Sequence, residues 1–110
     1  MSSVNRTILP DELKQLFTQR QNILVLDVRR KSDYEKDGQK IPGAAWLDPD
    51  KITLWSTALP LDRNIVIYCV RGGSVSNSVV DQLKAKGVKA RFIEGGIEAW
   101  KQAGGETIPK

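Results

Sequence analysis

The sequence contains no histidine and a single cysteine, Cys69, among its 110 residues. The absence of histidine excludes Ser-His-Asp triads, Cys-His dyads, imidazole acid–base catalysis and His-ligated metal sites. One cysteine excludes an intramolecular disulfide, an intramolecular CxxC pair and a cysteine-rich zinc site. Catalysis by this chain must therefore use carboxylates, Lys or Arg, hydroxyls, backbone amides or one thiol. We expect neither a metal nor an organic cofactor.

Long apolar runs and clustered basic residues are also lacking. Residues 1–7 have no apolar segment of the kind that secretion signals carry, and no run approaches the length of a membrane span. The net charge of +4 comes from scattered Lys and Arg without interleaved aromatics, which does not favour a nucleic-acid surface. We therefore expect a cytoplasmic protein that binds neither nucleic acid nor membrane. No apolar stripe marks an interface, so a monomer is expected.

The length and the apolar pattern indicate one α/β domain over residues 1–110. Hydrophobic residues make up 40% and charged residues 27%, an ordinary globular composition with enough chain for one core. Two continuous apolar runs, residues 23–28 and 65–70, are typical of strands buried on both faces of a parallel sheet. Shorter strands are predicted at 4–8, 44–47 and 89–93. The expected architecture is a mainly parallel central sheet of about five strands.

Helical patterns separate the predicted strands. One helix is predicted from Pro10, with an apolar stripe to residue 17, and another over residues 74–86, with Gly87 as its stop. A short helix is expected from residue 97 to a stop at residues 104–105, and residues 50–58 are expected to form one or two helical turns. This alternation predicts helices on both faces of the sheet.

The most informative segment runs from Cys69 to Ser76, because it leaves a buried strand and enters a helix. Open α/β sheets bind ligands at such places. Gly72 and Gly73 allow a tight turn with converging N–H groups, and the next helix directs its positive end to the same point. Such a cradle favours the reactive thiolate form of a cysteine. The alternative is a small core cysteine without chemistry, but a core cysteine gains nothing from converging amides.

Cys69 is therefore predicted to be a nucleophile, and Arg71 adds a fixed charge that an anionic substrate could meet. The substrate-binding loop is predicted to comprise Val70, Arg71, Gly72, Gly73, Ser74 and Val75. Asp27 and Arg29 are supporting residues near the loop. They form either a structural ion pair or part of the rim, and the pair is favoured because a carboxylate beside a thiol disfavours the thiolate.

Outside the loop, the sequence suggests fewer site residues. Arg30 and Lys31 are interpreted as solvated side chains. Trp46, Trp55 and Trp100 are aromatic residues that pack in or near the core by default. Trp55 lies in the ambiguous segment 50–58 and is the best candidate for an exposed pocket wall.

Four motifs follow one another along residues 8–105 at compatible spacing. They are Asp27-Val28-Arg29, Ile41-Pro42-Gly43-Ala44 after Tyr34-Glu35, Cys69-Val70-Arg71-Gly72-Gly73-Ser74, and Glu94-Gly95-Gly96-Ile97-Glu98-Ala99-Trp100. Together they resemble the single-domain rhodanese family of sulfurtransferases. The resemblance implies a rhodanese-like α/β fold and sulfur transfer through a Cys69 persulfide. It implies a small anionic donor, thiosulfate or a persulfide, and an acceptor that is cyanide or a thiol, including a protein thiol.

Two residues depart from the pattern of that family. Lys40 stands where members often have histidine, and this change is expected to affect packing more than chemistry. Ser74 stands where many members place an arginine in the loop, which weakens one anion contact. Arg71 is a candidate to replace that contact.

Other functions stay open beside sulfur transfer. Cysteine phosphatases also use a thiolate in an anion cradle, but their Cys-x5-Arg loop requires an arginine where this chain has Val75. The loop therefore lacks the cation that stabilises phosphoryl transfer. A persulfide carrier that serves a protein partner, or a regulatory binding module of the same fold, are further alternatives with little small-molecule turnover.

Overall fold

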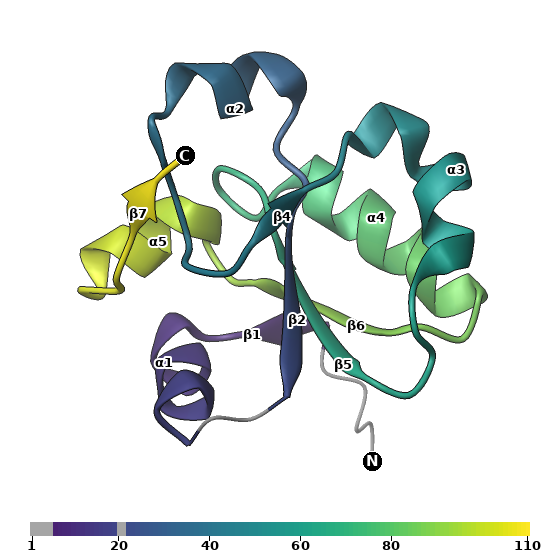
Figure 1. The fold of residues 1–110 in the computed structure, drawn as a ribbon, viewed down its shortest axis with the longest axis horizontal. Helices are drawn as coiled ribbons and strands as arrows, with labels where there is room; N and C mark the ends of the chain where they lie inside the picture. Colours follow the sequence, from purple (N-terminus) through teal and green to yellow (C-terminus); the bar gives the residue numbers. More distant parts are fainter. Residues whose placement is uncertain (1–5, 20–21) are drawn as a thin grey trace.

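A computed structural model describes residues 6–19 and 22–110 and shows a parallel sheet flanked by helices (Figure 1). The strand order is β1-β6-β5-β2-β4, and every neighbouring pair is parallel. The strands are β1 (Thr7–Ile8), β2 (Ile23–Asp27), β4 (Ala45–Trp46), β5 (Asn64–Tyr68) and β6 (Lys89–Ile93). The predicted parallel sheet of about five strands is thus confirmed. Residues 4–5 of the first predicted strand lie outside the described residues.

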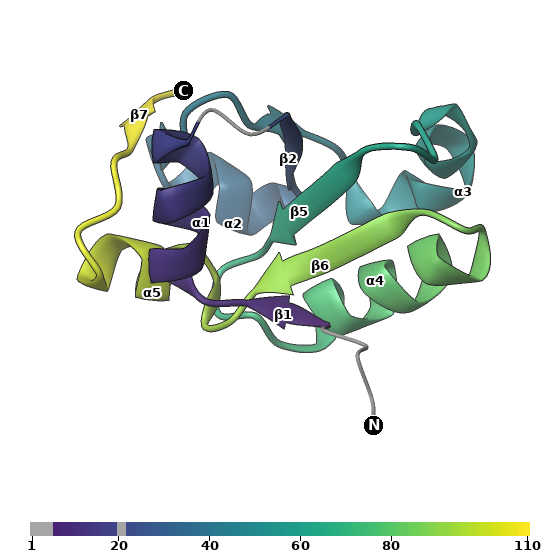
Figure 2. The same cartoon turned by 90° about the horizontal axis from the view of Figure 1, so that it is seen from below.

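Helices cover both faces of the sheet, as the alternation predicted (Figures 1 and 2). On one face, α1 (Pro10–Thr18) and α5 (Gly96–Gln102) form an apolar core that includes Leu13, Ile97 and Trp100. On the other face, α3 (Ile52–Trp55) and α4 (Ser74–Ala85) cover a second core. Short 3-10 turns, Pro49–Lys51 and Ser56–Ala58, flank α3, so the ambiguous segment 50–58 is helical.

The connections define where a ligand site can form. The chain leaves β5 through α4 to reach β6 on one side, and it leaves β2 to reach β4 on the other. The carboxyl ends of β2 and β5 therefore lie at a switch point of the topology, the place where open α/β sheets form a ligand crevice. Asp27 at the end of β2 pairs in register with Tyr68 at the end of β5. Residues following these two strands must meet at this crevice.

Three elements were not predicted from the sequence. Helix α2 (Lys31–Lys36) follows β2 and buries none of its residues, so it has no apolar stripe to reveal it. Strands β3 (Gln39–Lys40) and β7 (Ile108–Pro109) form a separate antiparallel pair of two residues each. Such short pairings carry no periodic signal. Within the described ranges, no helix is long and apolar enough to cross a membrane.

Candidate active site

Cys69 lies immediately after β5, and its side chain opens into a pocket of about 320 Å³ at the switch point. The residue is buried, with 6% of its surface exposed. The pocket is lined by Arg30, Asp33, Cys69, Val70, Arg71, Gly73, Ser74 and Val75. Every predicted loop residue except Gly72 therefore lies at the pocket wall, and Arg30 and Asp33 join them from the segment that follows β2. Cys69 therefore lies at the wall of a pocket and at the end of a buried strand.

The loop presents unpaired backbone N–H groups beside the thiol. Among the described residues, no N–H of residues 70–76 donates a hydrogen bond to another group of the chain. The first N–H with an acceptor is that of Asn77, which donates to the Gly73 carbonyl at 3.1 Å. The N-terminal amides of α4 carry the partial positive charge of the helix dipole. This segment can therefore stabilise negative charge that develops on the sulfur or on a bound anion.

Ser76 is a site residue that sequence reasoning missed. Its side chain is completely buried, and its Oγ donates a hydrogen bond to Cys69 Sγ at 2.9 Å. A hydroxyl donor stabilises a thiolate more than a neutral thiol, because a hydrogen bond to a charged acceptor is stronger than one to a neutral acceptor. The sequence did contain a signal for this residue. Ser76 lies in the first turn of the helix that follows the loop, and from there its side chain can reach back to the end of β5.

We expect the Ser76→Ala protein to lose about tenfold in kcat/KM for sulfur transfer, the range of one charge-assisted hydrogen bond. The rate of Cys69 alkylation by iodoacetamide should fall in parallel, because both reactions use the thiolate. Ser78→Ala is the matched control, since Ser78 is exposed on the same helix and its Oγ accepts only from Gln82. Equal rates for the two variants would remove Ser76 from the site.

Helix α5 holds the other side of the loop. The Ile97 N–H donates to the Cys69 carbonyl at 2.9 Å, and the Glu98 N–H donates to the Val70 carbonyl at 3.2 Å. Gly96 has a φ of 66°, and a Cβ on it would lie 2.5 Å from the Cys69 carbonyl oxygen. Only glycine combines this left-handed backbone with such close approach. The Gly95-Gly96 turn therefore places the last helix against the active loop.

Arg71 lines the pocket but also contacts α5. Its Nε lies 3.3 Å from Glu98 Oε2, and the two side chains are 80% and 46% exposed. An ion pair this exposed contributes little energy, so an anion can compete for the guanidinium. Even so, Glu98 offsets the positive charge that the loop offers. The role of Arg71 as a substitute for the arginine missing at Ser74 stays a prediction.

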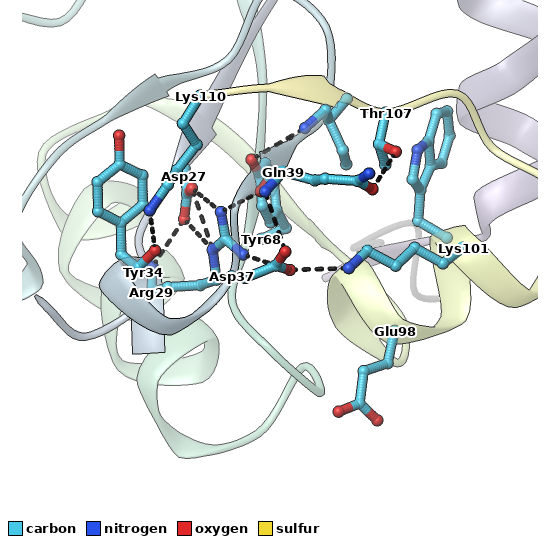
Figure 3. Close-up of polar contacts among 12 residues, drawn as sticks. Asp27, Arg29, Tyr34, Asp37, Gln39, Tyr68, Glu98, Lys101, Thr107 and Lys110 are labelled. Carbon is cyan, nitrogen blue, oxygen red and sulfur yellow. Dashed lines mark hydrogen bonds and ion pairs between the residues drawn. The ribbon is translucent and has the colours of Figure 1, made fainter. Parts of the chain in front are cut away.

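A buried ion pair lies at the end of β2, the strand that pairs with β5 (Figure 3). Arg29 Nη2 and Asp27 Oδ2 are 2.7 Å apart, and both side chains are 1% exposed. Asp27 also accepts from the Arg29 backbone N–H at 3.0 Å. Burial disfavours the charged guanidinium, but the hydrogen bond and the charge of Asp27 outweigh it and raise the pKa of Arg29. The interpretation of Asp27 and Arg29 as a structural ion pair is therefore supported by their contacts.

Tyr68 completes the buried end of β5. Burial, and next the negative charge of Asp27, raise the pKa of the Tyr68 phenol well above its ordinary value. The phenol oxygen accepts a hydrogen bond from the Ile41 N–H at 3.3 Å. Tyr68 thus stays neutral at all moderate pH values and ties the Ile41-Pro42-Gly43-Ala44 segment to the central strand.

Asp37 extends the ion network to α5, as Figure 3 shows. Its Oδ2 lies 3.0 Å from Arg29 Nη1 and 2.8 Å from Lys101 Nζ. Partial burial opposes ionisation, but the hydrogen bonds from Lys101 and the Gln39 N–H, with the charges of Lys101 and Arg29, lower the pKa of Asp37. The network therefore joins the end of β2, the residue after α2 and helix α5.

This lowered pKa predicts an acid-dependent loss of stability. A carboxyl group whose pKa is lower in the folded state stabilises the fold above its ordinary pKa of 3.8, and loses that contribution as the pH falls below it. We expect Asp37→Asn to reduce the free energy of unfolding by about 1 kcal/mol at pH 6 and by clearly less at pH 3, because the contribution fades as the pH falls from 3.8 through the lower pKa of the folded state. Urea denaturation at both pH values measures this. A deficit as large at pH 3 as at pH 6 would contradict the electrostatic cause, and Asp62→Asn is an exposed control.

Trp55 does not belong to the site, and the prediction of an exposed pocket wall was wrong. Its ring is half-buried against the core between α4 and the sheet, and its Nε1 donates to the Asp48 carbonyl at 2.8 Å. Trp100 is buried in the opposite core, as expected. Within residues 6–19 and 22–110, no three His, Cys, Asp or Glu side chains gather in a way that could hold a metal ion.

Comparison with known proteins assigns the chain to a family. The family model described as the rhodanese-like domain matches residues 9–103. The chain belongs to the rhodanese-like domain family. The resemblance drawn from the four motifs is thereby confirmed. The matched residues include the Cys69 loop, which resembles the active loop of the family.

Individual relatives agree with this assignment. A sulfurtransferase of Allochromatium vinosum is 30% identical over 95 residues, which is 86% of this chain and 86% of that protein. An uncharacterised protein of Synechocystis is 31% identical over 97% of this chain, but the chain spans only 58% of that relative. The solved structure of a rhodanese-related protein from Thermoplasma volcanium has a TM-score of 0.83 at 23% identity, covering 96% of this chain and 99% of that one. That structure shows the same rhodanese fold.

Proposed function

We propose that this rhodanese-like chain is a sulfurtransferase. It moves a sulfane sulfur from a donor such as thiosulfate or a persulfide to a thiophilic acceptor through a persulfide on Cys69. The observation that carries the proposal is the surroundings of Cys69: a buried thiol at a pocket wall, a 2.9 Å hydrogen bond from Ser76 Oγ, and a loop of unpaired N–H groups. Membership of the rhodanese-like family and the name of the Allochromatium relative support the reaction class.

The reaction proceeds in two covalent steps. In the first, the Cys69 thiolate attacks the outer sulfur of thiosulfate, an Sγ–S bond forms, and the S–S bond of the donor breaks. Sulfite leaves with the electron pair of that bond. In the second, a thiol or cyanide attacks the outer sulfur of the Cys69 persulfide and returns the thiolate. The Ser76 hydroxyl and the N–H groups of residues 70–76 stabilise the sulfur anion at both stages.

The geometry disfavours a phosphatase. A phosphate dianion in a cysteine loop requires a guanidinium clamp to stabilise the charge of the transition state. This chain has Val75 at the position of that arginine, and the loop cation, Arg71, is paired with Glu98.

Mass measurement of the intact protein tests the proposal. Incubation with thiosulfate or a small persulfide, followed by removal of the donor, should add the mass of one sulfur atom to the chain, and peptide mapping should locate it at Cys69. Absence of added sulfur with every donor would contradict the proposal and favour a regulatory binding module. Release of the sulfur to cyanide or a small thiol with repeated turnover then separates a transferase from a carrier that serves only a protein acceptor.

A further inference from the structure

The charges around the Cys69 pocket do not fit a simple anion-binding site. Two cations, Arg30 and Arg71, and one carboxylate, Asp33, line the wall. Arg71 already faces Glu98, whose N–H is bonded to the loop carbonyl of Val70. The side-chain charges on the loop side of the pocket therefore nearly cancel. The two other charged residues of the wall, Arg30 and Asp33, then determine which substrate charges are favoured.

Arg30 and Asp33 are the two side chains on that side. Neither forms an ion pair with another residue in the part of the chain that the structure describes. Arg30 is the residue that precedes α2 and Asp33 lies in its first turn. Both residues line the Cys69 pocket. The α2 side of the pocket thus presents one positive and one negative group to whatever occupies it.

An unpaired carboxylate in this position opposes a dianion such as thiosulfate. It repels the donor, and it does so beside the thiolate that must attack. A donor that carries a cation of its own is instead attracted by the Asp33 carboxylate. If that donor also has a carboxylate, Arg30 can bind it. Opposite charges on a small donor, separated by one carbon atom, are the property of an α-amino acid.

We propose that Cys69 takes its sulfur from a small zwitterionic persulfide of the α-amino-acid class, such as cysteine persulfide, with Arg30 binding the carboxylate and Asp33 the ammonium. This specificity rests on the sulfurtransferase function proposed above. The Cys69 thiolate attacks the outer sulfur of R–S–SH, so that an Sγ–S bond forms and the S–S bond of the donor breaks. The electron pair leaves on the inner sulfur as a cysteine thiolate, which takes a proton from water. No oxidant or reductant is consumed.

The experiment compares three persulfides that differ only in charged groups. Cysteine persulfide has both groups, 3-mercaptopropionate persulfide lacks only the ammonium, and cysteamine persulfide lacks only the carboxylate. Single-turnover rates of sulfur addition to Cys69 are followed by mass spectrometry. The wild-type protein should prefer cysteine persulfide to 3-mercaptopropionate persulfide by up to about fivefold, the range of an exposed ion pair.

The variants assign each charge to its residue. Asp33→Asn should bring the ratio of cysteine persulfide to 3-mercaptopropionate persulfide close to one. Arg30→Gln should slow both carboxylate donors by a similar factor and should not slow cysteamine persulfide, which carries no carboxylate. Glu35→Gln and Lys31→Gln remove the same charges from exposed positions of α2 outside the pocket, and they should leave the ratios unchanged. Full discrimination in Asp33→Asn, or equal wild-type rates with both carboxylate donors, would overturn the proposal.

A second measurement separates this proposal from the sulfurtransferase function itself. Alkylation of Cys69 by bromoethylamine, iodoacetate and iodoacetamide probes the same charges without sulfur transfer. Asp33→Asn should slow alkylation by the cationic bromoethylamine relative to the neutral iodoacetamide. Arg30→Gln should slow alkylation by the anionic iodoacetate relative to iodoacetamide. Unchanged ratios overturn the recognition of a zwitterion even if sulfur is transferred. Failure of every donor to add sulfur, with the alkylation ratios shifted as expected, overturns the sulfurtransferase function alone.

Discussion

The Cys69→Ser protein is expected to lose at least about a thousandfold in sulfur-transfer rate, because serine cannot supply the thiolate that attacks sulfane sulfur. No other cysteine exists in the chain to replace it. The loop amides and the pocket remain in the variant, so binding of the donor alone should not rescue turnover. Steady-state rates with thiosulfate and cyanide measure the loss, and intact mass after incubation should show no added sulfur.

The substitution should leave the fold intact, which makes the result interpretable. Within the described part of the chain, Cys69 Sγ has one hydrogen-bond partner, Ser76 Oγ, and a serine hydroxyl can keep a bond to it. We expect the urea midpoint of Cys69→Ser to match that of the wild-type protein closely. Activity retained by this variant would contradict covalent catalysis at Cys69, whereas loss of activity with loss of folding would require the Cys69→Ala protein as a second variant.

The Asp27→Ala protein is expected to lose about 3 kcal/mol in its free energy of unfolding, because it leaves the buried guanidinium of Arg29 without its main partner. Arg29 keeps a contact with Asp37, which limits the loss. Typical domains are stable by only 5–15 kcal/mol, so the variant should unfold at a markedly lower urea concentration. Equilibrium urea denaturation at neutral pH measures the difference.

Two controls define the cause of that loss. Asp81→Ala breaks the exposed ion pair with Arg6, whose atoms are 2.7 Å apart, and should cost less than about 1 kcal/mol. Replacing Asp27 and Arg29 together with asparagine and methionine removes both buried charges and should cost less than Asp27→Ala alone. A loss in Asp27→Ala no larger than in Asp81→Ala would mean that burial adds nothing to the pair.

Much of the fold followed from the sequence because its main signals are local. The continuous apolar runs before Asp27 and Cys69 became the two central parallel strands, β2 and β5. Parallel strands end at the same edge, so the neighbourhood of Asp27, Arg29 and the Cys69 loop followed from strand order alone. The Gly-rich turns were also local features, since a left-handed backbone requires glycine.

The missed parts of the site depend on contacts between distant segments. Arg30 and Asp33 reach the pocket because a short helix without an apolar stripe turns over the end of β2, and no periodicity predicts that turn. Trp55 was assigned to a pocket wall because its segment was ambiguous. In the structure its ring packs against a core formed by α4 and the sheet, which are distant from it in the sequence. Ser76 lay within the quoted segment, but only the three-dimensional turn of α4 brings its hydroxyl to the sulfur.

In residues 6–19 and 22–110, strand β1 joins the sheet through β6 alone, and this has a consequence for synthesis of the chain. Thr7 pairs with Phe92 and Ile8 with Ile93, so each pair is 85 residues apart. At about 5–20 residues per second, roughly 4–17 s pass between the emergence of the two partners. A contact of helix α1 forms after a similar interval, because Phe17 packs edge-on against Trp100 of α5. We therefore expect β2, β4 and β5 to associate first on the ribosome, and the N-terminal strand and helix to dock last.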